Sequence, residues 1–169
     1  MKADELRAMQ APLKERYRET PEAALITLRA QGRAGEGVSC KVETGKGLAL
    51  AGLHPATGGT GQQACSGDML LEALVACAGV TLNAVATSLG IVLREASVEA
   101  EGDLDFRGTL GVSKEVPVGF QDIHLHLSLD TDASEEQVAP LVRLTERYCV
   151  ILQTLRNPPP ISVSRSVGS

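Results

Sequence analysis

A chain of 169 residues, 43% of them apolar, is long enough for one folded domain with a buried core, but it contains no Trp, two Phe and two Tyr. Leu, Val, Ile and Ala must therefore build the core, and an aromatic platform for stacking bases or sugars is not expected. The net charge of −5 argues against nucleic acid and against an anionic membrane surface as partners.

The N-terminus is charged throughout and lacks the apolar segment of a signal peptide. No apolar run is expected to reach the length of a membrane span. We therefore expect a cytoplasmic protein. In that compartment Cys40, Cys65, Cys77 and Cys149 are reduced at rest, so they are small core residues or thiols with chemistry of their own, not a structural disulfide framework.

The first third of the chain predicts a helix followed by an antiparallel meander. Residues 3–19 have the spacing of an exposed amphipathic helix. Its apolar side is formed by Leu6, Met9, Leu13 and Tyr17. The alternating residues 24–30 predict a half-buried strand, and residues 32–35 predict the turn after it. Two further strands are expected at 38–42 and 48–53.

The middle of the chain predicts its most apolar element. Residues 54–67 are rich in glycine and predict a loop, and residues 68–88 predict a helix that is apolar nearly all round, as a central buried helix is. Ser66 is expected to cap this helix, and Asp68 is expected to interact with the helix dipole from the first turn. Gly90 is expected to end the helix.

The last part of the chain predicts two strands, a helical segment and a closing strand. Alternation over 98–101 and, most regularly, over 123–130 predicts strands separated by a polar loop at 103–118. The capping-box sequence at 134–137 opens a helical segment that is expected to run, with a break, to three consecutive prolines. Residues 161–163 are expected to form the closing strand. Segregated helices and antiparallel strands predict the α+β class.

Two cysteines lie on the apolar faces of predicted helices. Cys77 shares its face with Thr81, and Cys149 also points inward by its spacing. A buried structural thiol is the common case for such positions. Two inward cysteines on core helices can also meet, which would permit a reversible disulfide bond. Cys40 is expected to pack in a strand, and Cys65 to lie in a loop.

The histidines and the glycine-rich loop do not predict a metal site or a nucleotide-binding site. His124 and His126 share one strand face, but Leu and Ile occupy the opposite face, so the histidines are expected to point to solvent. The glycine-rich loop lacks the ending of a P-loop, and no nucleophile elbow is present. Arg33 is either a solvated turn arginine or a cation that lowers the pKa of a nearby thiol. Asp68 is either a helix N-terminal charge or a partner that orients Arg33.

Several segments together resemble the OsmC/Ohr family, the osmotically inducible protein C-like and organic hydroperoxide resistance-related proteins. SGDMLLEALVACAGVTL around Cys77 resembles the central helix of the family, and ERYCVILQTL around Cys149 resembles its second cysteine motif. The glycines at 32–35 and 58–61 resemble a Gly-Arg-x-Gly turn and a G-G-x-G loop of the hydroperoxide resistance branch. The resemblance covers residues 24–167.

This resemblance implies an OsmC-like domain, 23–169, and the N-terminal helical extension, 1–22, is an addition relative to the shortest members of the family. It implies an intertwined homodimer in which antiparallel sheets from both subunits wrap around long central helices. The residue at the Cys77 position attacks the distal peroxide oxygen and becomes a sulfenic acid. The residue at the Cys149 position condenses with it to a disulfide, and the Arg33 position holds the thiolate ionised.

The implied activity is a thiol peroxidase that reduces organic hydroperoxides without metal or bound cofactor, and a dithiol such as a dihydrolipoyl group regenerates it. The chain departs from the branch at two positions. Gly67 stands where a glutamate pairs with the arginine, with Asp68 beside it, and Val150 replaces the usual proline after the second cysteine. The alternatives are a non-catalytic stress protein that binds a small apolar ligand at the dimer interface, and a thiol redox sensor.

Overall fold

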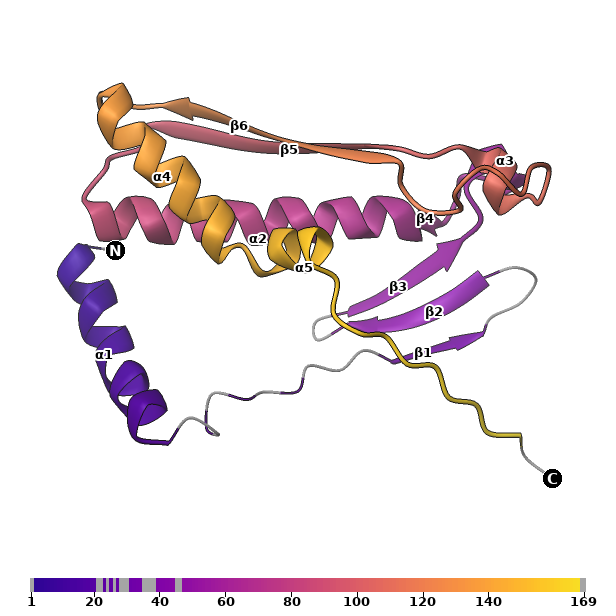
Figure 1. Ribbon diagram of the computed structural model, residues 1–169, viewed down its shortest axis with the longest axis horizontal. Coiled ribbons are helices and arrows are strands. Elements are labelled where there is room, and N and C mark those ends of the chain that lie inside the picture. The colour runs from indigo at the N-terminus through magenta and orange to yellow at the C-terminus, as the bar shows by residue number, and fades with distance from the viewer. Residues whose placement is uncertain are drawn as a thin grey trace.

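A long helix, α2 (Ser66–Leu89), runs through the molecule and carries a strand hairpin along its length (Figure 1). The structure, a computed structural model, describes residues 2–20, 23, 25, 27, 31–34, 39–44 and 47–167, and for residues 18, 31–34, 39–44 and 47 it describes the backbone alone. The other elements are α1 (Ala3–Glu19), β1 (Gln31–Ala34), β2 (Ser39–Thr44), β3 (Gly47–Gly52), the short 3-10 helix η2 (Pro55–Thr57), β4 (Ala64–Cys65), β5 (Glu95–Asp103), α3 (Phe106–Thr109), β6 (Asp122–Asp130), α4 (Glu135–Tyr148) and α5 (Val150–Arg156).

The predicted limits of α2 agree with the structure to within two residues, but Ser66 is the first residue of the helix and not its N-cap. Asp68 lies in the first turn, and Gly90 ends the helix with φ 72°, a conformation that glycine adopts without steric cost. Ser66 was expected to cap the helix and does not. It is the first helical residue, because β4 leads the chain in extended conformation through Cys65 directly into the helix.

The first sheet has the order β1-β2-β3-β4, antiparallel except for the parallel pair of β3 and β4. The predicted strand at 24–30 falls mostly outside the described residues. The prediction of a turn at 32–35 is wrong for its first three residues, because they form β1. Gly32 pairs with Val42, and Arg33 pairs with Lys41. Glycine accepts extended as well as turn conformations, so pairing with β2 decides the outcome here.

The second sheet is the antiparallel hairpin-like pair of β5 and β6, which lies along α2 (Figure 1). Val98 of β5 pairs with Leu127 of β6, and both side chains are partly buried. The rings of His124 and His126 are exposed on the opposite side of β6, with centroids 6.4 Å apart. The predicted alternation of both strands is confirmed, and within the predicted loop at 103–118 the chain forms the short helix α3.

The core consists of two clusters on the buried side of α2. The first contains Leu82, Val85, Ala86, Ile91 and Leu141. The second contains Leu74, Ala78, Cys149 and Leu152, with Cys77 packed against it. The capping box that opens α4 is present as predicted, with the Ser134 backbone N–H donating to the Gln137 side chain at 3.0 Å. It fixes the start of the helix that carries Leu141 into the core.

Leu141→Ala is expected to lower the free energy of unfolding by about 3 kcal/mol, because a fully buried leucine leaves a cavity when truncated. Urea denaturation at one fixed protein concentration measures the change. Leu110→Ala is the control, since Leu110 is 56% exposed and its truncation is expected to change stability by less than about 0.5 kcal/mol. Equal losses in the two variants would contradict this description of the core.

Helix α1 has the predicted limits, but most of its apolar side is uncovered. Leu6 is 8% exposed and packs on the rest of the molecule, whereas Met9, Leu13 and Tyr17 are 54%, 45% and 37% exposed. The helix therefore contacts α2 mainly through its first turns (Figure 1).

The closing strand predicted at 161–163 is wrong. Residues 157–167 contain no strand or helix, and Ile161 and Val163 are 85% and 94% exposed. A strand needs a neighbouring strand to satisfy its backbone groups, and none of the described strands pairs with this segment. The prolines at 158–160 also lack the N–H groups that such pairing uses.

The expectation that no apolar run reaches the length of a membrane span is also wrong. Among the described residues, α2 is long and apolar enough to cross a membrane by length and composition. It packs against β5, α4 and α5, as the core helix of a soluble protein does, yet only 22% of its most apolar window is buried. One apolar side of α2 therefore remains uncovered in the single chain.

Candidate functional site

Cys77 and Cys149 meet where α2 passes the junction of α4 and α5. Cys77 is partly buried on α2, and Cys149 is 0% exposed. Their side chains are hydrogen-bonded to each other, and both belong to the apolar cluster around Leu74 and Leu152. The two cysteines whose spacing predicts inward-pointing side chains are thus in contact. Their sulfurs are close enough to hydrogen-bond to each other.

The break between α4 and α5 occurs at Cys149 itself. Its backbone is extended, with φ −71° and ψ 105°, so α4 ends before it and α5 begins after it at Val150. A helix start leaves its first N–H groups without partners in the helix. The N–H groups of Val150 and Ile151 bond to the Cys77 sulfur. Because proline has no N–H, Val150 supplies a donor that the usual family residue lacks.

The two thiols are differentiated by their surroundings. Burial raises the pKa of Cys77, but hydrogen bonds outweigh it and lower that pKa below its ordinary value. The donors are the Ile151 N–H, the Cys149 thiol, the Val150 N–H and the Thr81 hydroxyl. Burial raises the pKa of Cys149, and the neighbouring Cys77 sulfur raises it further. Cys77 therefore ionises first, and Cys149 remains a neutral donor to the Cys77 thiolate.

Thr81 and the two N–H groups are functional groups that sequence reasoning missed. Thr81 lies one turn after Cys77, and its single hydroxyl hydrogen is shared between the Cys77 sulfur and the Cys77 carbonyl, which lies 2.7 Å from Oγ1. The i, i+4 spacing on the Cys77 face was the available signal, but no role followed from spacing alone. Backbone donors such as those of Val150 and Ile151 carry no signature in residue type.

The reactivity of Cys77 is expected to rise with pH and to reach its half-maximum below the ordinary pKa of a thiol, because the reactive form is the thiolate. In Thr81→Val the pKa of Cys77 is expected to rise, which moves the curve to higher pH. The rate of alkylation by iodoacetamide measures this. Thr87→Val is the matched control, since Thr87 makes the same kind of bond, 2.7 Å to the Asn83 carbonyl, farther along α2. Identical curves for both variants would contradict a role for Thr81.

The remaining predicted site residues are less fully placed. Arg33 lies in β1, and its side chain is outside the part of the chain that the structure describes. Asp68 is exposed nine residues before Cys77, about 14 Å along the helix axis, so within one chain it does not reach the thiol pair. Gly67 has room for a side chain, since a Cβ there would lie 3.5 Å from Phe120 and 3.6 Å from the Cys65 sulfur. The roles of Arg33 and Asp68 stay predictions.

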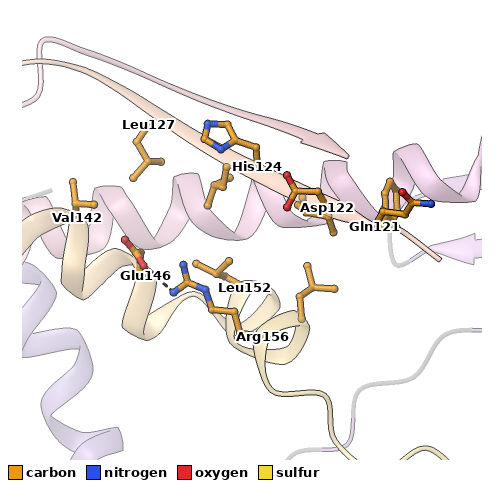
Figure 2. A pocket seen from close by; sticks show the side chains of 12 residues that line it. Gln121, Asp122, His124, Leu127, Val142, Glu146, Leu152 and Arg156 are labelled. Carbon is orange, nitrogen blue, oxygen red and sulfur yellow. Dashed lines mark hydrogen bonds and ion pairs between the residues drawn. The ribbon is translucent and has the colours of Figure 1, made fainter. Parts of the chain in front are cut away.

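A cavity of about 560 Å³ lies between β6 and the two helices α4 and α5 (Figure 2). Its apolar lining includes Leu125 and Leu152, which also pack around Cys149. An ion pair between Arg156 and Glu146, 2.8 Å long, lies at the helical side, and His124 lies at the strand side (Figure 2). Within the described residues no group of three His, Cys, Asp or Glu side chains is arranged to hold a metal ion.

Comparison with known proteins identifies the relatives of this chain. The family model for OsmC-like protein matches residues 59–164, which include both thiols of the pair. Among curated proteins, none matches the chain by sequence.

Several solved structures share the fold, and three of them are compared with the chain below. An OsmC-like protein from Mycoplasma pneumoniae superposes with a TM-score of 0.66 at 16% identity, covering 79% of this chain and 89% of its own. An organic hydroperoxide resistance protein from Elizabethkingia anophelis has a TM-score of 0.64 at 19% identity, covering 80% and 91%. One from Legionella pneumophila, also described as a predicted redox protein, has a TM-score of 0.61 at 21% identity, covering 79% and 92%. At these identities the likeness shows the fold, which is the α+β fold expected from the resemblance.

Proposed function

This chain belongs to the OsmC-like protein family, and we propose that within it the protein acts as a cysteine-based peroxidase that reduces organic hydroperoxides. The observation that carries the proposal is the asymmetric thiol pair, with the pKa of Cys77 lowered by four donors and a neutral, buried Cys149 in contact with it. Relatives of the same fold described as organic hydroperoxide resistance proteins support the choice of substrate.

The reaction proceeds in two steps. The Cys77 thiolate attacks the distal oxygen of the peroxide, an S–O bond forms, the O–O bond breaks, and the alkoxide leaves as an alcohol after taking a proton. The Cys149 sulfur then attacks the Cys77 sulfenic acid, the S–S bond forms, the S–O bond breaks, and water leaves. The peroxide is reduced by two electrons, and the two thiols are oxidised to one disulfide.

An external dithiol, such as a dihydrolipoyl group, returns the disulfide to two thiols and is itself oxidised to a disulfide. Because the external thiols supply both electrons, the cycle needs no metal or bound cofactor. A cytoplasmic location fits the proposal, since reduced dithiols are maintained there.

The active form is a homodimer in which sheets from both subunits cover the central helices. Support for this comes from α2, whose uncovered side carries the exposed apolar residues Ala73, Ala76 and Val80. Apolar surface of this extent on a core helix is covered in the assembled form of a protein. The partner subunit would also bring a second copy of Arg33 and of Asp68, and the Asp68 of the same chain lies about 14 Å along α2 from Cys77.

Steady-state turnover of cumene hydroperoxide tests the proposal. With dihydrolipoamide as reductant, the alcohol is expected to form in proportion to the dithiol consumed. With peroxide alone, each chain is expected to lose two thiols. Unchanged thiols in the presence of excess peroxide would refute the proposed activity.

The second candidate function is binding of a small apolar ligand without catalysis. The cavity of about 560 Å³ between β6, α4 and α5 favours it, because small-molecule sites typically have volumes of about 300–1,000 Å³. In that case Cys77 and Cys149 are packing residues, and peroxide leaves both thiols reduced. The thiol count described above therefore separates the two functions. The third possibility, a redox sensor, would oxidise its thiols without sustained turnover.

A further inference from the structure

The break between α4 and α5 leaves one backbone carbonyl without its helical partner. In a continuous helix the Glu146 carbonyl would accept the N–H of Val150, four residues later. Here the Val150 N–H bonds to the Cys77 sulfur instead. The N–H that caps α4 is that of Cys149, and it donates to the Thr145 carbonyl at 3.0 Å. The Glu146 carbonyl therefore needs a donor from elsewhere.

Gln153 of α5 supplies that donor. Its side-chain amide donates to the Glu146 carbonyl at 2.8 Å, across the break. This bond is partly buried, so water competes less for it than for a surface bond. The backbone N–H of Gln153 donates to the Cys149 carbonyl at 2.9 Å. One residue thus holds both the end of α4 and the residue at which the helix breaks.

A second link joins the two helices through the side chain of Glu146. Its carboxylate accepts from the Arg156 guanidinium at 2.8 Å, and Arg156 is the last residue of α5 (Figure 2). The two side chains are 40% and 52% exposed, so we expect the ion pair to contribute less than the partly buried bond of Gln153. Helix α5 therefore holds Glu146 at its carbonyl and at its carboxylate.

We propose that Gln153 and Arg156 are positioning residues for the thiol pair: they hold the break at Cys149 in the form that keeps its sulfur against Cys77. Neither residue is among the groups that bond to the two sulfurs, so both act through the backbone around Cys149. The inference rests on the proposed function for the step in which Cys149 attacks a sulfenic acid. The contact between the thiols in the reduced protein does not depend on that function.

The physical reason is a competition for one N–H group. Without the amide of Gln153, the Glu146 carbonyl would compete with the Cys77 sulfur for the Val150 N–H. A bond from Val150 to Glu146 is the bond of a continuous helix, so it would extend α4 through Cys149. The Cys149 backbone would then change from extended to helical, and its sulfur would move away from Cys77.

Gln153→Met tests the proposal, because it keeps the length of the side chain and removes the donor to the Glu146 carbonyl. After one equivalent of cumene hydroperoxide, the disulfide is expected to form about tenfold more slowly than in the unmodified protein, and dimedone is expected to trap more sulfenic acid at Cys77. In the reduced protein, without peroxide, alkylation of Cys77 by iodoacetamide is expected to need a higher pH, because the sulfur loses an N–H donor. Thr154→Val is the matched control, since it removes a 2.8 Å bond to the Val150 carbonyl that stays within α5.

The ion pair is tested by a second pair of variants. Arg156→Gln is expected to slow disulfide formation about twofold, the modest effect of a half-exposed pair. Arg147→Gln removes the same charge from the last turn of α4, where the guanidinium lies over the Tyr148 ring at 5.6 Å and is not the partner of Glu146. It is expected to leave the rate unchanged. Equal rates in the two arginine variants would remove Arg156 from the proposal.

A rate of disulfide formation and an alkylation curve in Gln153→Met that coincide with those of Thr154→Val would overturn the role of Gln153, whatever the stability of the variant in urea. A purely structural residue would lower stability without moving either readout. If peroxide leaves the thiols of the unmodified protein reduced, the proposed peroxidase is refuted, and the alkylation curves alone decide about Gln153. A shift to higher pH in Gln153→Met only would then support its positioning role.

Discussion

Cys77→Ser is expected to lower kcat/KM for cumene hydroperoxide by about a thousandfold or more, because a nucleophile carries the covalent step that the rest of the site only assists. A serine hydroxyl in the same place is not ionised at neutral pH and does not attack a peroxide oxygen. The four groups that lower the pKa of Cys77 have no thiolate to stabilise in this variant. Initial rates of alcohol formation with dihydrolipoamide present measure the loss.

Cys65→Ser is the control for this prediction. Cys65 is a free, partly exposed thiol directly before α2, and it is remote from the cluster that contains the reactive pair. Its variant is expected to keep the rate of the unmodified protein to within about twofold, as surface changes away from a site do. A large loss in Cys65→Ser, or a small one in Cys77→Ser, would assign the nucleophile to the wrong residue.

Cys149→Ser is expected to convert the enzyme into one that stops after the first step. The Cys77 thiolate still attacks the peroxide, but the sulfenic acid has no neighbouring thiol to condense with. One thiol per chain is then consumed, and excess peroxide drives Cys77 on to the irreversible sulfinic acid. Mass spectrometry after dimedone trapping detects the sulfenic acid, and repeated additions of peroxide measure the inactivation.

The unmodified protein is the reference for this experiment, because its disulfide is expected to protect Cys77 through many additions of peroxide. Survival of activity in Cys149→Ser with the same resistance to peroxide would mean that another thiol, such as Cys65, resolves the sulfenic acid. That result would contradict the pairing of Cys77 with Cys149.

Much of the fold could be predicted because its main elements repeat apolar residues with one clear period. Helix α2 and strands β5 and β6 have this property, and their predicted limits lie within a few residues of the observed ones. The predictions of a turn at 32–35 and of a strand at 161–163 are wrong for a common reason. Whether a segment becomes a strand depends on a partner strand, and the sequence of one segment does not reveal whether such a partner lies beside it.

The candidate site could be predicted in part. The faces of their helices directed Cys77 and Cys149 inward, and the structure brings them together. What separates their pKa values could not be predicted, since it comes from the break at Cys149 and the N–H groups that the break leaves free. A side-chain pattern records neither the extended backbone at Cys149 nor the direction of an N–H group.

The linkage formed by one equivalent of cumene hydroperoxide in the unmodified, reduced protein tests the central claim most directly. Peptide mass mapping under acidic, non-reducing conditions identifies which cysteines are joined. A Cys77–Cys149 disulfide, with Cys65 still free and one alcohol released per disulfide, is the predicted result. A linkage between any other pair, or four reduced thiols with the peroxide intact, would contradict the account.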